Sequence, residues 1–147
     1  MKKILVVILL LCIAASITAC TLKPITGDDF AQVMKDRGFA VEDLSHKEPL
    51  AQQVIVAQCK DYQLEFYLLA DKSEAGSVYA GNKEQIKALP GGKTTTEVTG
   101  MNFSRFSCTV EGSYYLIAYV DNTFLFCKAA AQFEDQVDDH FEALGYK

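Results

Sequence analysis

The chain has 147 residues, half of them apolar and 11% aromatic, so it can bury a core and extended disorder is excluded. The net charge is −5, but the 14 basic residues include Lys2 and Lys3, the only charges among the first 19 residues. The remainder carries 12 basic against 19 acidic side chains, a net charge of −7, which excludes a nucleic-acid partner and attachment to an anionic bilayer by charge.

Residues 1–19 have the pattern of a signal peptide. Lys2 and Lys3 form a short positive region, and the next twelve residues, Ile4 to Ala15, are all apolar. A helix that crosses a bilayer needs about 20 such residues, so this run fits the hydrophobic region of a signal peptide. We therefore expect the segment to direct export.

The leader ends in Ile17-Thr18-Ala19-Cys20, which resembles the lipobox of bacterial lipoproteins. That resemblance implies cleavage between Ala19 and Cys20, and a diacylglycerol on the Cys20 thiol. It places the protein at the cell membrane, on its extracytoplasmic face, because two or three acyl chains anchor stably. The alternative is ordinary secretion with cleavage after Ala19.

Residues 20–25 form a lipidated tether, which reaches at most about 20 Å when extended. Such a short tether favours a role close to the membrane. Residues 26–147 then make one domain, since about 120 residues support a single core.

Three helices are predicted in chain order. The first is capped by Thr26 and ends at Gly38, and the second begins with the capping box Asp71-x-x-Glu74 and stops before Pro90. The third carries apolar residues at helical spacing and ends at Gly145.

Strands are predicted at 53–58, 62–68, 113–120 and 123–128, with one or two more over 94–110 and a short one near 39–41. The order α-β-β-α-β-β-β-α predicts an α+β fold, with an antiparallel sheet of five to six strands and about three helices. One apolar stripe on each helix fits two layers.

Three cysteines remain in the mature part, Cys59, Cys108 and Cys127, in an exported setting that permits disulfides. Two-residue turns would place Cys108 opposite Tyr115 and Cys127 opposite Leu116, hence on opposite faces of the sheet. This leaves Cys59 with Cys108, Cys59 with Cys127, or three free thiols.

No pattern predicts catalysis, a metal site or a cofactor. The lone histidines His46 and His140 form no Cys/His pair at ligand spacing, and Gly91-Gly92-Lys93-Thr94 lacks the first glycine of a phosphate-binding loop, since Lys87 stands there.

The best candidates for an interaction surface are Tyr67, Tyr115 and Tyr119, on the alternate face of the sheet. The other interpretation is that a helix covers that face.

The mature part is similar to small uncharacterised lipoproteins of Gram-positive bacteria, in which a short lipidated tail leads into a D-D-F helix and a Q-L-E-F-Y strand. This resemblance implies no activity. We therefore expect a non-enzymatic binding or interaction module, with the membrane and a membrane-proximal envelope protein as partners. The alternatives are a lipoprotein that binds a small molecule or lipid, and a small hydrolase.

Overall fold

The computed structural model describes residues 21–47 and 49–147. The predicted signal peptide, Ala19 and the predicted lipid-bearing Cys20 lie outside the described residues. The helices are α2 (Gly27–Asp36), α3 (Lys72–Lys87) and α4 (Glu134–Ala143), with short 3-10 turns η1 (Ser45–Lys47) and η2 (Ala131–Phe133). The strands are β1 (Ala40–Asp43), β2 (Gln53–Gln58), β3 (Gln63–Leu68), β4 (Lys93–Thr99), β5 (Phe103–Val110), β6 (Ser113–Val120) and β7 (Thr123–Ala130).

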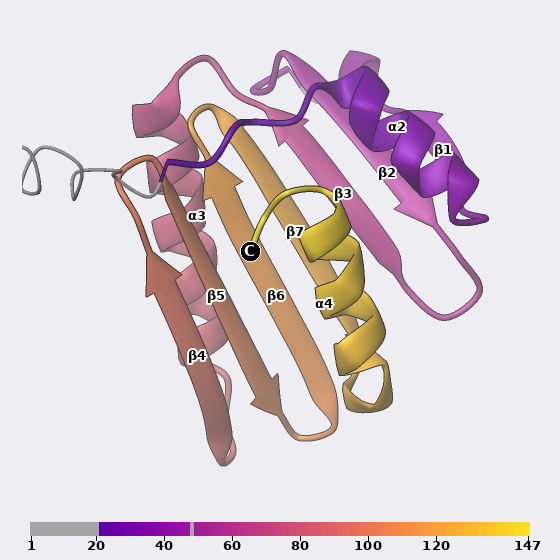
Figure 1. Ribbon diagram of the computed structural model, residues 1–147. Helices are drawn as coiled ribbons and strands as arrows, with labels where there is room; N and C mark the ends of the chain where they lie inside the picture. Colours follow the sequence, from indigo (N-terminus) through magenta and orange to yellow (C-terminus); the bar gives the residue numbers. More distant parts are fainter. Residues whose placement is uncertain (1–20, 48) are drawn as a thin grey trace, which may run out of the picture.

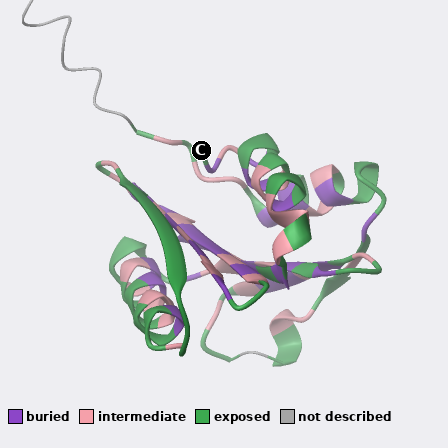
Figure 2. Ribbon diagram, turned by 90° about the horizontal axis from the view of Figure 1, so that it is seen from below, coloured by how far each residue is buried: buried purple, intermediate pink, exposed green. Residues whose placement is uncertain are grey.

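All seven strands form one antiparallel sheet in the order β1-β2-β3-β7-β6-β5-β4. Helices α2 and α4 lie on one face and α3 on the other (Figure 1), so the sheet is the middle of three layers, not one of two. The view along the strands shows the sheet strongly twisted between these helices (Figure 2). The α+β class, the antiparallel sheet and the three helices agree with the sequence prediction.

The strand count differs from the predicted five to six because both edges of the sheet carry weak signals. Strand β1 has only four residues, and two of them are acidic. All seven residues of β4 are exposed, and its Thr-rich sequence has no apolar alternation. Both strands fall in segments where a strand was predicted, near 39–41 and over 94–110, but an edge strand without a buried side gives no period-2 pattern that fixes its number or bounds.

The predicted caps are present. The Thr26 side chain accepts from the Asp29 amide at 3.1 Å, and Asp71 accepts from the Glu74 amide at 2.9 Å. The Glu111-Gly112 turn has positive φ at both residues, as a two-residue hairpin turn requires. This turn sets the predicted pairing of Cys108 with Tyr115, and the Asp121-Asn122 turn sets that of Leu116 with Cys127.

The two faces of the sheet bury separate cores. The larger one, under α2 and α4, centres on the fully buried Phe30, Phe66 and Phe141. The smaller one lies under α3, where Tyr79 and Ile86 meet Phe106 of β5. Among the described residues, no helix is both long and apolar enough to cross a membrane.

Candidate functional site: a groove along helix α3

Helix α3 contacts β5, β6 and β7 on its face of the sheet. An open groove runs between this helix and the sheet. It consists of three depressions that share wall residues, Tyr67 and Val78 joining the first to the second and Asn82 and Phe126 joining the second to the third. We call it the α3 groove; its walls are Leu50, Ala51, Glu65, Tyr67, Leu69, Glu74, Val78, Asn82, Gln85, Ile86, Leu89, Tyr115, Phe124 and Phe126.

The groove exists because the apolar stripe of α3 is wider than its contact with the sheet. Ala75, Tyr79 and Ile86 are buried, whereas Val78 and Leu89, which belong to the same predicted stripe, are only half-buried. On the floor, Phe126 is half-buried as well. The groove therefore exposes aromatic and aliphatic side chains over the length of a 16-residue helix.

The structure brings two of the three predicted surface tyrosines to this groove. Tyr67 lies between its first two depressions, and Tyr115 lines the third. Tyr119 lies beneath α3 instead, where its ring packs edge-on against Tyr79 at 5.3 Å between centroids. All three tyrosines are half-buried: Tyr119 contacts α3, and Tyr67 and Tyr115 line the groove beside the helix.

A few polar groups fix the orientation of the groove walls. The Tyr67 hydroxyl donates to Glu65 Oε2 at 2.6 Å, and Gln63 donates to the other carboxylate oxygen at 2.7 Å. The Tyr67 ring packs on Phe124, with the centroids 5.9 Å apart. At the third depression, Lys128 places its ammonium 5.3 Å from the centre of the Tyr115 ring.

Each depression of the groove is small. The three volumes are about 210, 270 and 180 Å³, below the roughly 300 Å³ at which small-molecule pockets begin. A separate depression of about 310 Å³ lies beside the start of α2, but its walls include the polar residues Asp28, Gln53 and Asn122. Its walls also include the apolar residues Pro24, Ile25 and Leu68.

The three cysteines of the described residues are free thiols. Cys108 lies in the core under α3 and Cys127 in the core under α2 and α4, so the sheet separates them. Cys59, which directly follows β2, packs against the same core as Cys127 of β7, but β3 lies between β2 and β7, and strands two apart are separated by about 9.6 Å, which exceeds disulfide reach. Burial raises the pKa of the Cys127 thiol to about 12, which makes it unreactive.

His140 is part of a polar cluster that joins α2, α4 and the start of β3. Arg37 donates to its Nδ1 at 2.7 Å, so Nδ1 is unprotonated and Nε2 carries the proton that it donates to the Tyr62 hydroxyl at 2.9 Å. Arg37 also forms an ion pair with Asp139 at 2.7 Å. Both ring nitrogens are occupied, and neither bonds a serine or a carboxylate as the hydrolase alternative would need. His46 lies in the exposed turn η1.

This cluster predicts that stability falls in mild acid. Burial, and then the Arg37 charge, lowers the pKa of His140 below 6.5, so the folded state favours the neutral ring. The stabilisation is present above the unfolded-state pKa and is lost as pH falls through the lower folded-state pKa. We expect a lower urea midpoint at about pH 5 than at about pH 7.5. His140→Gln should flatten this difference, with His46→Gln as the matched control; an unchanged slope in His140→Gln would contradict the assignment.

Groups of three or more potential metal ligands are absent from the part of the chain that the structure describes. The Asp/Glu-rich helix α4 does not form one: its Asp138 pairs with Arg105 and its Asp139 with Arg37. These carboxylates connect the helix to the sheet and to α2.

Comparison with known proteins identifies no family. No family model matches the chain, and no curated protein matches it. One solved structure that is similar is the crystal structure of a GTP-binding regulator from Thermotoga maritima. It is 12% identical, with a TM-score of 0.48 over 82% of this chain and 88% of that one.

Proposed function

We propose that the mature domain is a membrane-anchored, extracytoplasmic interaction module that binds a partner protein through the α3 groove. The lipobox-like Ile17-Thr18-Ala19-Cys20 supports the anchor and its location. The observation that carries the interaction is the groove itself, a row of open, partly aromatic depressions along one helix.

The form of the groove favours a protein segment over a single small molecule. Its depressions have the size of individual side chains and follow one another from Leu50 to Leu89. A segment with apolar side chains at intervals would fill them in sequence, while Glu65 and Asn82 offer polar contacts between them. Tyr67 and Tyr115 are tyrosines, one of the residue types that contribute most of the binding energy at protein interfaces.

The start of the described chain supports a role close to the membrane. Asn102, in the β4–β5 turn, accepts from the Leu22 amide at 3.0 Å and donates to the Leu22 carbonyl at 2.7 Å. Residues 22–25 are therefore held against the domain and do not act as a free tether. Since Cys20 is two residues before Leu22, it lies within about 7 Å of this fixed point.

Crosslinking in intact cells tests the proposal. The full chain and its Cys20→Ser variant are expressed at equal levels, treated with an amine-reactive crosslinker, and recovered by an affinity tag. We expect the wild type in the membrane fraction with a defined crosslinked partner, and Cys20→Ser in the soluble fraction without it, because the change removes the acyl anchor and leaves residues 21–147 unchanged.

The matched control for the groove is Tyr115→Ala, which keeps Cys20. This variant should remain in the membrane fraction and lose most of the crosslinked partner. A partner captured equally by the wild type and by Tyr115→Ala would contradict the groove as the contact site, and a Cys20→Ser chain that stays in the membrane fraction would contradict the anchor.

A further inference from the structure

The exposed apolar side chains of the described residues are concentrated at one end of the sheet. Leu50, Met101 and Val98 are the large hydrophobic residues that stand exposed, at 82%, 67% and 45%. Met101 lies in the turn that joins β4 to β5, and Val98 is near the end of β4 that leads into this turn. The rest of the apolar surface is distributed over half-buried positions, so this end requires an explanation.

The connections at this end are tied to one another. The Asp121 amide donates to the Asn102 carbonyl at 2.8 Å, and the Leu69 amide donates to the Asn122 carbonyl at 2.8 Å. The Gln52 amide donates to the Leu68 carbonyl at 2.8 Å, which places the segment that follows Leu50 at the same end. Met101 and the segment that follows Leu50 therefore lie at the same end of the sheet.

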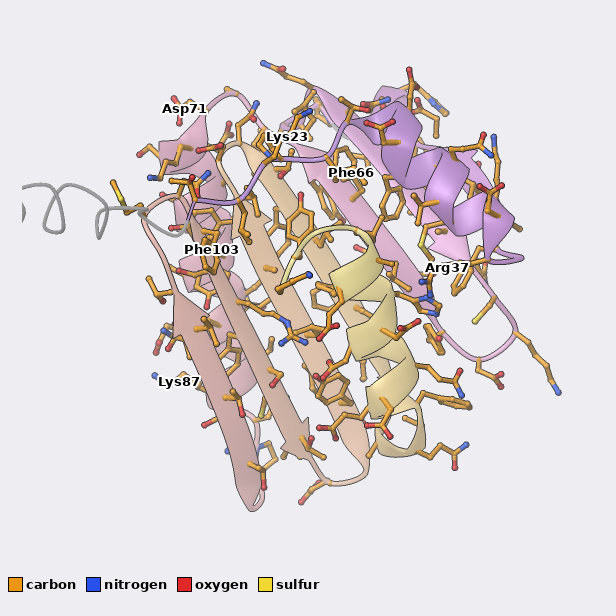
Figure 3. The ribbon with its side chains drawn as sticks, in the orientation of Figure 1. Lys23, Arg37, Phe66, Asp71, Lys87 and Phe103 are labelled. Atoms are coloured by element: carbon orange, nitrogen blue, oxygen red, sulfur yellow. The ribbon has the colours of Figure 1, made fainter. Side chains whose placement is uncertain are left out.

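The chain from Cys20 enters the domain at this end of the sheet. Leu22 is bound on both its amide and its carbonyl by Asn102, the residue next to Met101. Asn102 is itself fixed, because its side-chain amide also donates to Asp121 at 2.9 Å. Figure 1 shows the entering chain beside the β4–β5 turn, and Figure 3 places Lys23 and Asp71 at this end and Lys87 at the other.

These observations carry an inference that rests on the proposed lipid anchor: we infer that this end of the sheet, with Met101 and Leu50, rests on the bilayer surface. With Cys20 within about 7 Å of Leu22, the acyl chains start beside Met101 and the turn cannot stand far from the lipid. Lys72 suits such a boundary, since its ammonium donates to the Met101 carbonyl at 2.7 Å and is positioned at the level of the headgroups.

This orientation also places the α3 groove. Leu50 and Glu74 line its first depression, at the end of the sheet that rests on the bilayer. Leu89 lines its last depression, next to the opposite end of the helix. The groove therefore rises from the bilayer surface. A partner that fits it is a segment of a membrane protein directly outside its membrane-spanning part.

An environment-sensitive fluorophore on single cysteines tests whether this end of the sheet contacts the bilayer. The full chain carries Cys59→Ser, and Cys108 and Cys127 are kept because they are buried. Three variants add one cysteine each: Met101→Cys, Leu50→Cys and, as the matched control at the opposite end, Lys87→Cys. Labelled membranes are compared with and without lipids that bear a nitroxide quencher. We expect a blue-shifted emission and at least twofold quenching at positions 101 and 50, and neither at 87.

A further variant tests the role of Asn102. Asn102→Ala keeps Cys20, so the chain should stay in the membrane fraction while the probe at position 101 loses its blue shift and most of its quenching. In the chain that keeps Asn102, a membrane-bound protein whose probe at 101 is as exposed to water as the probe at 87 would overturn the contact of this sheet end with the bilayer, but not the anchor. A chain recovered only in the soluble fraction would overturn the anchor as well.

Discussion

Phe66→Ala is expected to lower the free energy of unfolding by about 3–5 kcal/mol. Phe66 lies in the middle of β3 with no exposed surface, and its ring stacks on Phe30 of α2 at 5.3 Å between centroids. The substitution leaves a cavity under α2 that the closely packed core cannot fill. Urea unfolding of the purified chain, followed by circular dichroism, measures the effect.

The matched control is Val98→Ala, at a side chain of β4 that is 45% exposed. It removes apolar atoms without opening a cavity, so its effect should stay within about 0.5 kcal/mol. A loss of less than about 1 kcal/mol in Phe66→Ala would mean that α2 is not packed on β3 as described.

Asp138→Ala is the second large effect, with an expected loss of about 1–3 kcal/mol. Arg105 of β5 is mostly buried, and its Nη2 lies 2.9 Å from Asp138 Oδ1 of α4. The Tyr114 hydroxyl donates to the same oxygen. Removing the carboxylate leaves a buried guanidinium without its counter-charge and a buried hydroxyl without its acceptor, which costs more than the net value of either contact.

The control for this prediction removes both charges. Arg105→Met combined with Asp138→Ala should recover a large part of the loss, because the methionine fills the same space without a charge. The free energies of the wild type, the two single variants and the double variant give the coupling between the residues. A coupling near zero would contradict the ion pair.

The sequence predicted those parts of the fold in which a local signal and a buried face coincide. Helix α2 begins where Thr26 can cap it, and the Glu111-Gly112 turn gave the register of β5 and β6. Strand β4 lies in the segment 94–110 that was predicted to hold one or two strands, but whether it is a separate strand stayed open, because its side chains are all exposed and pairing with β5 is its main structural contact. Backbone pairing of this kind leaves no pattern in the side chains.

The candidate site was predictable only in part. Period-2 alternation placed Tyr67 and Tyr115 on the alternate face of the sheet, and the helical stripe included Val78 and Leu89. What the sequence does not contain is the lateral position of α3 on the sheet. That position brings Tyr119 against Tyr79 of the helix and leaves Tyr67 beside the helix, and it depends on packing between segments far apart in the chain.

The most direct test of the α3 groove as the contact site of the anchored protein is photocrosslinking from the groove in intact cells. A photoreactive amino acid replaces Tyr115 in the full chain, and the control carries it at Ser77, which is exposed on α3. We expect a discrete adduct with a membrane protein from position 115, absent from position 77 and lost when Cys20→Ser is added. Adducts of equal yield from both positions, or an adduct from position 115 that persists without Cys20, would contradict it.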